Sequence, residues 1–308
     1  MIHLVSINPA LDYTFKLKNA SRGKIGEVVA FNLEPAGKAL NIARFLGRWG
    51  TPCRTWLGTG GGADPTHVLF RSLLKKEGLS VTYLGSSAPM RKNVVIQNEQ
   101  GSKKYNHPGF AIKDLTFKRL YEAIKEKDLV VLTGRLPQGM SSSLLKNWIG
   151  SLKRKNAKTI LDSSGLPLKI ALRAKPWFLK VNLHELSQAL SVNYKNMDQI
   201  PSIIKNRLLK MGIVHGAVTF GSWGAVIWDN QEIYRVQTRQ VNPLELVVGA
   251  GDGFLTGYLK GLSQGLDFPQ RAVLASATGA SVAHLGIDRF QPNHVERSLR
   301  TTTIRRIP

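Results

Sequence analysis

The sequence has little cysteine and no long apolar runs. Cys53 is the only cysteine among 308 residues, which excludes an intrachain disulfide and any zinc site built from several cysteines. The seven histidines show no metal-ligand spacing, so nothing indicates a transition metal. The longest apolar runs, such as residues 129–132, have the length of a strand and exclude a membrane-spanning helix. With no signal peptide visible at the N-terminus, we expect a cytoplasmic protein.

Acidic residues are also scarce. Asp and Glu total 20 against 43 Lys and Arg, a formal net charge of +23. Such an excess of positive charge can favour binding to nucleic acid, to an anionic membrane or to acidic substrates. The basic residues are dispersed in short groups, however, and no zinc finger or RNA-binding motif with stacking aromatics accompanies them. We therefore interpret the charge as solvated surface and expect neither a membrane nor a nucleic acid as partner.

What is present is the pattern of an α/β protein. From residue 114 onward, expected helices at 114–126, 141–154, 165–173, 183–190 and 197–211 alternate with short apolar strands. Short links between alternating elements predict parallel strands covered by helices. We expect one domain over residues 1–308, with a mostly parallel central sheet and helices on both faces. The basic tail from Asn293 onward is expected to be loosely held.

Two segments depart from this alternation. Residues 13–33 and 93–106 alternate loosely between apolar and polar residues, which predicts half-exposed strands. The strands expected at 94–97 and 103–106 are separated by Asn98-Glu-Gln-Gly, as in a hairpin. We expect these segments to form a small β lid beside the main sheet.

The chain is organised around residues 247–259, where a turn of Gly249, Ala250 and Gly251 runs into a helix. The unpaired N–H groups at a helix start, with the helix dipole behind them, attract an anion. Asp252 follows the turn, and a carboxylate there could take a proton from a hydroxyl that attacks a phosphoryl group. The alternative is an ordinary turn with Asp252 as the helix N-cap, a common use of Asp.

Further polar groups follow predicted strands or begin helices. In an open parallel sheet, ligands bind beyond the carboxyl ends of the strands. Each group alone has a simpler explanation, because Asp12 could be a turn residue and Lys38 a solvated charge. No phosphate-binding loop of the form Gly-x-x-x-x-Gly-Lys-Ser/Thr occurs in the sequence. The groups expected at this edge are Asp12, Gly37-Lys38, Thr133-Gly134-Arg135, Asp162-Ser163-Ser164, Asn182 and Gly249–Asp252.

Short motifs stand in a fixed order along the chain, at 6–12, 36–41, 91–93, 133–139, 161–165, 180–185, 219–224 and 249–252. Taken in this order, they resemble those of the ribokinase-like carbohydrate kinases of phosphofructokinase B type. The opening Asn-Pro-Ala-Leu-Asp looks like the branch that phosphorylates sugar phosphates, namely 1-phosphofructokinase and tagatose-6-phosphate kinase. The resemblance covers residues 1 to 290.

The resemblance implies a role for each matching residue. Asp252 matches the family's catalytic base, and Gly249, Ala250 and Gly251 match its anion hole. Asn182 and Glu185 match a motif that places magnesium through water. Substrate binding is implied for Asp12, Gly37, Lys38, Asn41, Arg91 and Asn93, and nucleotide binding for Lys180, Thr219, Gly221 and Gly224.

Some positions depart from the family pattern. Ala39 stands where glycine is usual and is expected to narrow the sugar site, and Arg135 adds a cation to the substrate rim. Gly253 replaces a serine, which removes a hydroxyl beside Asp252. None of these departures removes the base or the anion hole, so they bear on the substrate more than on the reaction.

The resemblance implies a kinase that uses ATP and Mg²⁺ to phosphorylate a ketohexose phosphate, with fructose 1-phosphate first and tagatose 6-phosphate second. In this branch the lid often mediates a homodimer. Two alternatives stay open: a kinase of an unphosphorylated sugar or nucleoside, and a non-catalytic kinase fold that binds nucleic acid through its basic surface. The intact Asp252 and Gly-Ala-Gly turn argue against the second alternative.

Overall fold

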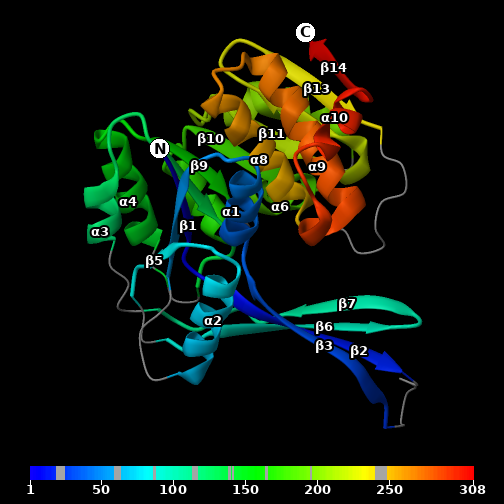
Figure 1. The fold of residues 1–308 in the computed structure, drawn as a ribbon. Coiled ribbons are helices and arrows are strands. Elements are labelled where there is room, and N and C mark those ends of the chain that lie inside the picture. Colours follow the sequence, from blue (N-terminus) through cyan, green and yellow to red (C-terminus); the bar gives the residue numbers. More distant parts are fainter. Residues whose placement is uncertain are drawn as a thin grey trace.

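A ten-stranded sheet forms the centre of the computed structural model, which describes residues 1–18, 25–58, 64–85, 88–112, 117–137, 140, 142–163, 166–194, 196–239 and 248–308. The strand order is β14-β13-β12-β11-β10-β9-β8-β1-β4-β5 (Figure 1). Strands from β5 to β11 pair in parallel and the last three antiparallel. The strands are β1 (Ile2–Ser6), β4 (Cys53–Leu57), β5 (Val81–Tyr83), β8 (Leu129–Thr133), β9 (Lys158–Asp162), β10 (Phe178–Asn182), β11 (Gly216–Thr219), β12 (Ala225–Trp228), β13 (Ile233–Thr238) and β14 (Thr302–Ile307).

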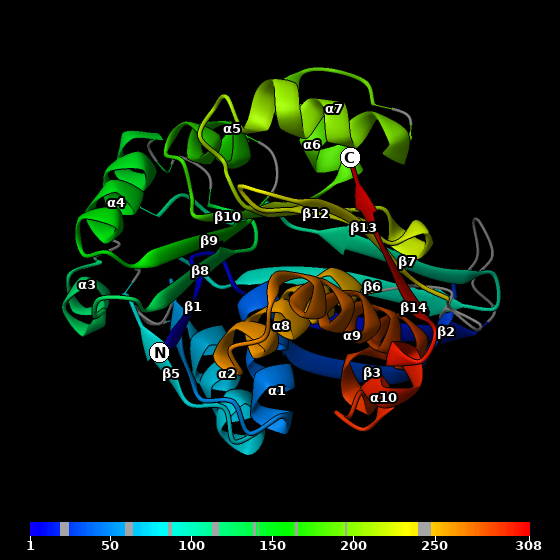
Figure 2. The ribbon, with the colours of Figure 1, turned by 90° about the horizontal axis from the view of Figure 1, so that it is seen from above.

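Helices cover both faces of this sheet, which confirms the predicted architecture (Figure 2). On β1, Ile2 and Leu4 pack into the layer of α1 and α8, whereas Val5 packs into the opposite layer, as does Ile7 just after the strand. No helix within the described ranges is long and apolar enough to cross a membrane. One face carries α1 (Lys38–Arg48), α8 (Ala250–Ser263), α9 (Phe268–Arg289) and α10 (His294–Leu299), and the other carries α3 (Lys118–Ala123), α4 (Ser142–Arg154), α5 (Leu166–Arg173), α6 (Leu183–Leu190) and α7 (Ile200–Ile203).

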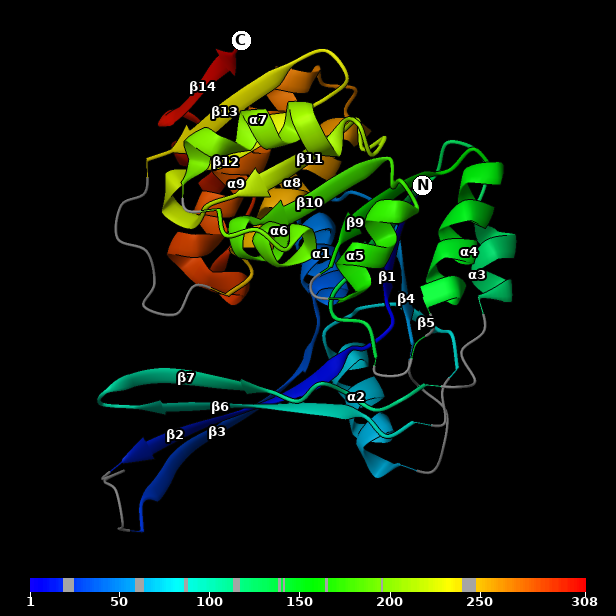
Figure 3. The ribbon, with the colours of Figure 1, turned by 180° about the vertical axis from the view of Figure 1, so that it is seen from behind.

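A second sheet of four strands extends away from the first (Figures 1 and 3). Its order is β3-β2-β6-β7, built from β2 (Ala10–Lys18), β3 (Glu27–Ala36), β6 (Arg91–Asn98) and β7 (Gly101–Asn106). The segments predicted to form a lid are therefore strands of one small sheet; residues 19–24 of the first segment lie outside the described residues. Its register places Asp12 opposite both Glu34 and Asn93.

Helix α2 (Pro65–Lys76) joins the two sheets and follows directly from its sequence signals. The Asp64 side chain caps the helix by accepting a hydrogen bond from the N–H of Thr66, and Pro65 occupies the first helical position. Burial of Phe70 and Leu74 anchors it against Leu11 and Leu40.

Two expectations for the C-terminal half are wrong. The tail from Asn293 is ordered, because α10 packs on α9 and β14 pairs with β13 along its whole length. Its alternation of Thr, Ile and Arg suits an edge strand better than a loose tail. The single helix expected at 197–211 is instead a 3₁₀ turn (Met197–Gln199), α7 and a π-helical turn (Ile204–Leu208).

In the first half of the chain, helix α3 is shorter than the helix expected at 114–126, and residues 113–116 lie outside the described residues.

Candidate active site

One cavity of about 1400 Å³ brings the predicted site residues together. Its lining comes from the carboxyl ends of the main-sheet strands, from α1 and α8, and from the four-stranded sheet. Every residue expected to act in catalysis, substrate, nucleotide or metal binding lines it except Ala250 and Gly224. Of the other groups expected at this edge, Thr133, Asp162 and Ser163 do not line the cavity, and Ser164 lies outside the described residues. Gly224, at φ 90°, lies in the turn before β12, where an added Cβ would be 2.1 Å from the Val236 carbonyl oxygen.

Asp252 lies in the first turn of α8 and is not its N-cap, so that alternative is wrong. Gly249 is the N-cap, with φ 85°, and has no side chain that could cap the helix. An added Cβ at Gly249 would lie 2.8 Å from Cγ1 of Ile287, so both conformation and space favour glycine. Within the described part of the chain, no side chain accepts a hydrogen bond from the N–H groups at the start of α8, as an anion site requires.

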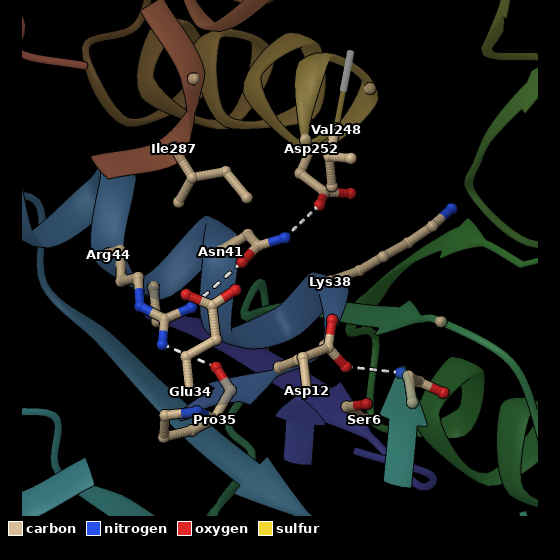
Figure 4. Close-up of a pocket in the computed structure, with 18 of the residues that line it drawn as sticks. Ser6, Asp12, Glu34, Pro35, Lys38, Asn41, Arg44, Val248, Asp252 and Ile287 are labelled. Atoms are coloured by element: carbon tan, nitrogen blue, oxygen red, sulfur yellow. Dashed lines mark hydrogen bonds between the residues drawn. The ribbon is translucent and has the colours of Figure 1, made fainter. Parts of the chain in front are cut away.

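The Asp252 carboxyl group is buried, with 5% of the residue exposed. It accepts a hydrogen bond from Nδ2 of Asn41 at 2.8 Å (Figure 4). Burial raises its pKa to about 6 and Asp162 adds to the rise, while the opposing effects of Lys38, Asn41 and Lys180 are smaller in sum. A carboxylate with this pKa is ionised at neutral pH and can accept a proton from a bound hydroxyl.

Asp162, at the end of β9, fixes two lysines beside Asp252. Its Oδ1 accepts hydrogen bonds from Nζ of Lys38 at 2.9 Å and of Lys180 at 3.2 Å, and Thr133 donates to Oδ2 at 3.4 Å. Burial alone would raise the pKa of this fully buried carboxyl, but the two lysines lower it below its usual value. The sequence placed Asp162 at this edge of the sheet, but its function as the anchor of two lysines was missed.

The two lysines lie close to the start of α8. An added Cβ at Gly251 would be 2.7 Å from Nζ of Lys180, so glycine leaves room for that ammonium group. Burial opposes the charge of Lys38, yet Asp162 and Asp252 together raise its pKa above the usual value. Asp162 therefore holds both lysine side chains next to the helix N-terminus, where they add to its attraction for an anion.

On the small sheet, Asp12 is the centre of a second polar cluster. It accepts hydrogen bonds of 2.6 Å from both Nδ2 of Asn93 and Nζ of Lys104. Lys104 is a site residue that the sequence did not suggest. Its strand β7 pairs antiparallel with β6, with Lys104 opposite Val95, so finding it required the register of the sheet.

Arg91 and Arg135 lie near enough to repel each other. Burial lowers the pKa of the Arg91 guanidinium, Asp12 opposes this effect and Arg135 adds to it. Nε of Arg91 is buried and has no hydrogen-bond partner among the described residues. Two adjacent guanidinium groups with an unsatisfied donor suit an anionic ligand such as a phosphate.

The residues expected to hold nucleotide and magnesium lie at the other end of the cavity. Asn182 and Glu185 form a capping box, in which each side chain accepts the other residue's backbone N–H, at 2.8 and 2.9 Å. This is the geometry of a well-capped α6, and it leaves the second carboxylate oxygen of Glu185 outside the box. Thr219 donates to the Val181 carbonyl at 3.4 Å, and Gly221 has φ 58°.

Ala39 does not narrow the sugar site as expected. It is fully buried, packs against the main sheet with Ile42, and is not among the residues that line the cavity. Residue 39 lies on the face of α1 that turns to the sheet, whereas Lys38 and Asn41 turn to the cavity. The missing serine at Gly253 also has a packing reason, because an added Cβ would be 2.7 Å from Cγ2 of Val282.

A cationic helix N-terminus beside a buried carboxyl, on an α/β sheet with a small second sheet, defines a kinase that acts on a hydroxyl group. Residues 2–286 match the pfkB family carbohydrate kinase, and the chain belongs to this family. It is a sugar kinase that transfers phosphate to a hydroxyl, which confirms the class that the motifs indicated.

Known proteins with similar sequences include 1-phosphofructokinases. The chain is 27% identical over 296 residues to the 1-phosphofructokinase of Bacillus subtilis, and the matched region covers 94% of this chain and 96% of that protein. It is 26% identical over 283 residues to the 1-phosphofructokinase of Haemophilus influenzae, covering 90% and 88%. Phosphofructokinase-2 from Escherichia coli, solved in complex with fructose-6-phosphate, has the same fold, with a TM-score of 0.86, 22% identity and coverage of 97% and 98%.

Proposed function

We propose that this protein phosphorylates a hydroxyl of a ketohexose phosphate with ATP, with fructose 1-phosphate as the first acceptor and tagatose 6-phosphate as the second. One observation carries the proposal: the buried Asp252, with its pKa raised to about 6, adjoins the uncapped start of α8 and two fixed lysines. The similarity to 1-phosphofructokinases along nearly the whole chain supports the choice of acceptor.

In this mechanism Asp252 takes the proton of the acceptor hydroxyl, and the oxygen of that hydroxyl attacks the γ-phosphorus of ATP. The bond from that phosphorus to the β–γ bridging oxygen breaks, and ADP leaves. The N–H groups of Gly249, Ala250 and Gly251, with Lys38 and Lys180, stabilise the charge on the transferring group. Asn41 keeps Asp252 in place through its 2.8 Å hydrogen bond.

The acceptor's own phosphate is assigned to Arg91 and Arg135. Their adjacent guanidinium groups and the unsatisfied Nε of Arg91 support this assignment. The resemblance implied substrate binding for Lys38, but its Nζ donates to Asp162, and Asp162 and Asp252 raise its pKa, which supports a function at the transferring phosphoryl group. Asp12, held by Asn93 and Lys104, is oriented to accept from sugar hydroxyls, and Gly37, with φ 146°, starts α1 beside it.

Lys180, Thr219, Gly221 and Gly224 are assigned to the nucleotide side. Asn182 and Glu185 would hold a magnesium ion through water, because Mg²⁺ keeps most of its waters and Glu185 retains a carboxylate oxygen outside its capping box. Within the described residues no group of three or more His, Cys, Asp or Glu could hold a metal by itself, which suits an ion that phosphate oxygens help to bind. When bound, the ion offsets negative charge on the phosphates.

A coupled assay of ADP release tests the function. Fructose 1-phosphate, tagatose 6-phosphate, fructose 6-phosphate, fructose and ribose are compared as acceptors. We expect turnover that requires a phosphate on the acceptor, and R91M should raise KM for that acceptor by about 10- to 100-fold, the value of a lost charge-assisted hydrogen bond. K92M is the matched control, because Lys92 is the next residue on β6 and is exposed.

Equal turnover of fructose or ribose would favour the alternative, a kinase of unphosphorylated sugars or nucleosides. An R91M enzyme with the KM of K92M would contradict the assignment of the phosphate site. If no acceptor stimulates ADP release, the proposed reaction is wrong.

We also propose that the small sheet mediates a homodimer. Tyr13, Phe15 and Phe31 form a cluster with ring centroids 5.3 to 6.5 Å apart, and Phe31 is 55% exposed. Val28, Val29 and Tyr105 of the same sheet are also exposed, and such a surface is typical of a buried interface. Light scattering during gel filtration should give a dimer, and F31S should weaken it. A monomer at micromolar concentration would contradict this proposal.

A further inference from the structure

The side chain of Arg44, on α1, is held from two directions outside its own helix. Its Nε and Nη2 donate to the two carboxylate oxygens of Glu77, at 2.8 and 3.0 Å. Nη2 also donates to the carbonyl oxygen of Pro35 at 2.7 Å. Glu77 is the C-cap of α2 and Pro35 is near the end of β3, so two separate elements fix one guanidinium group. Only 13% of the side chain is exposed.

The remaining direction of this guanidinium is toward Asn41. Nη1 of Arg44 donates to Oδ1 of Asn41 at 3.1 Å, and Nδ2 of Asn41 donates to Asp252 at 2.8 Å (Figure 4). The two residues are three apart on α1 and therefore share one face of the helix. A continuous chain of hydrogen bonds thus runs from Glu77 through Arg44 and Asn41 to Asp252.

The chemistry of the neighbours decides how the Asn41 amide is oriented. A guanidinium group can only donate hydrogen bonds, and an ionised carboxylate can only accept them. Asn41 must therefore present its oxygen to Arg44 and its NH₂ group to Asp252. Without Arg44, only the Asp252 carboxylate itself would orient the amide, and once Asp252 is protonated the amide oxygen could turn to accept from its O–H group.

We propose that Arg44 is a positioning residue, which locks the Asn41 amide so that it donates to the Asp252 carboxylate and holds that group ready to accept the proton of the acceptor. The inference rests on the proposed function of Asp252 as the base. It adds to that function a residue that does not touch the carboxylate itself and acts only through Asn41.

Arg44 has no need to act by its own charge. The charged groups that affect Asp252 are Lys38 from α1, Asp162 from β9 and Lys180 from β10. The charge of Arg44 is paired with that of Glu77. The charges of Arg44 and of Asp288, near the end of α9, both affect the pKa values of Glu34 and Arg48. Its effect on the carboxylate is therefore expected to disappear when Asn41 is absent.

The test is the pH dependence of kcat/KM in R44M. The hydrogen bond from Asn41 favours the ionised form of Asp252, so its loss should move the acid limb to higher pH, by about one unit. Carbon-13 NMR of labelled aspartate carboxyl groups should show the same shift for Asp252 in the protein without substrate. R44K keeps the positive charge but loses the planar guanidinium group with its several N–H donors. Its acid limb should therefore lie between that of the wild type and that of R44M.

R48M is the matched control. Arg48 is one turn further along α1, and it donates to the backbone carbonyls of Ile287 and Phe290 without contacting Asn41. Its substitution removes the same charge from the same helix, and the acid limb should stay where it is in the wild type. In N41A, adding R44M should produce no further shift, because the intermediate group is already absent.

Two results would overturn the inference: an acid limb in R44M and R44K that coincides with that of R48M, or a further shift when R44M is added to N41A. If R44M does not fold, the comparison of R44K with R48M decides the question. Failure of the proposed function is distinguishable, because it would appear as a wild-type protein that phosphorylates no acceptor. The NMR titration of Asp252 would still decide whether Arg44 acts on it.

Discussion

Asp162 and Asp252 are both buried carboxyl groups beside the same two lysines, yet their surroundings shift their pKa values in opposite directions. Asp162 accepts hydrogen bonds from both lysines and a threonine, and its pKa is lowered. Asp252 accepts one hydrogen bond from a neutral amide, and its pKa is raised to about 6. Burial acts alike on both, so direct contact with the ammonium groups makes the difference.

This difference assigns distinct roles to two residues of the same type. Asp162, whose pKa is lowered, forms ion pairs with Lys38 and Lys180 and fixes both side chains. Asp252 is kept near the pH at which a carboxylate exchanges protons, which suits a general base. Two titratable groups whose environments push their pKa values apart mark the acid–base chemistry of a site.

The largest effect is expected from D252N, which removes the proton acceptor while keeping the size of the side chain. A general base contributes about 10²- to 10⁴-fold to a rate, so kcat should fall by about three orders of magnitude. ATP binding should be unchanged, because the N–H groups and lysines that would hold its phosphates remain. Single-turnover kinetics and calorimetric titration with ATP provide the measurements. A D252N enzyme that keeps a tenth of its kcat would show that another group takes the proton.

The next effect is on stability: replacing Asp252 and replacing Asp162 by asparagine should change the free energy of unfolding in opposite directions. The folded-state pKa of Asp252 lies above the unfolded value of about 3.9, so its ionisation on going from pH 4 to pH 6 destabilises the fold. Removing that charge in D252N should raise the free energy of unfolding at pH 7.5 by about 1–3 kcal/mol. At pH 4 the gain should vanish.

D162N should have the opposite effect. The lowered pKa of Asp162 contributes stability above the unfolded pKa, and this contribution is lost as the pH falls through the folded value. Breaking a buried ion pair costs about 3–5 kcal/mol, so D162N should lose that amount at pH 7.5. Urea unfolding of both variants measures the two changes.

The control for both is D198N, since Asp198 is 83% exposed and lies 3.9 Å from Arg235. Its free energy of unfolding should change by less than about 0.5 kcal/mol. Equal changes in D162N and D252N would refute the contrast between the two groups.

Much of the fold was readable from the sequence because its signals are local. Asp64 and Pro65 are a cap and a first helical residue that start α2, and the alternation of strands and helices predicted the parallel sheet with two covered faces. The tail was misread because an edge strand with arginines shows little apolar periodicity until its partner β13 is known.

The site was predicted in part for the same reason. Lys38, Asn182 and Asp252 follow strands or begin helices, and the carboxyl edge of a parallel sheet gathers such residues. Asp12 was expected just beyond a strand but lies within β2 of the small sheet. The spacing of Asn41 and Arg44 on α1 is visible in the sequence, but their orientation toward Asp252 and Glu77 is not. Lys104 was missed because its position opposite Val95 depends on strand pairing.

The sequence by itself determined the class of fold, the family and the place of the proposed base after a small-residue turn, because these depend on neighbours along the chain. Only the tertiary structure decided which carboxyl group anchors the lysines and which is suited to act as a base. Burial favours a raised pKa for both groups, and only Asp162 has ammonium groups at 2.9 and 3.2 Å, whereas the 2.8 Å partner of Asp252 is the neutral amide of Asn41.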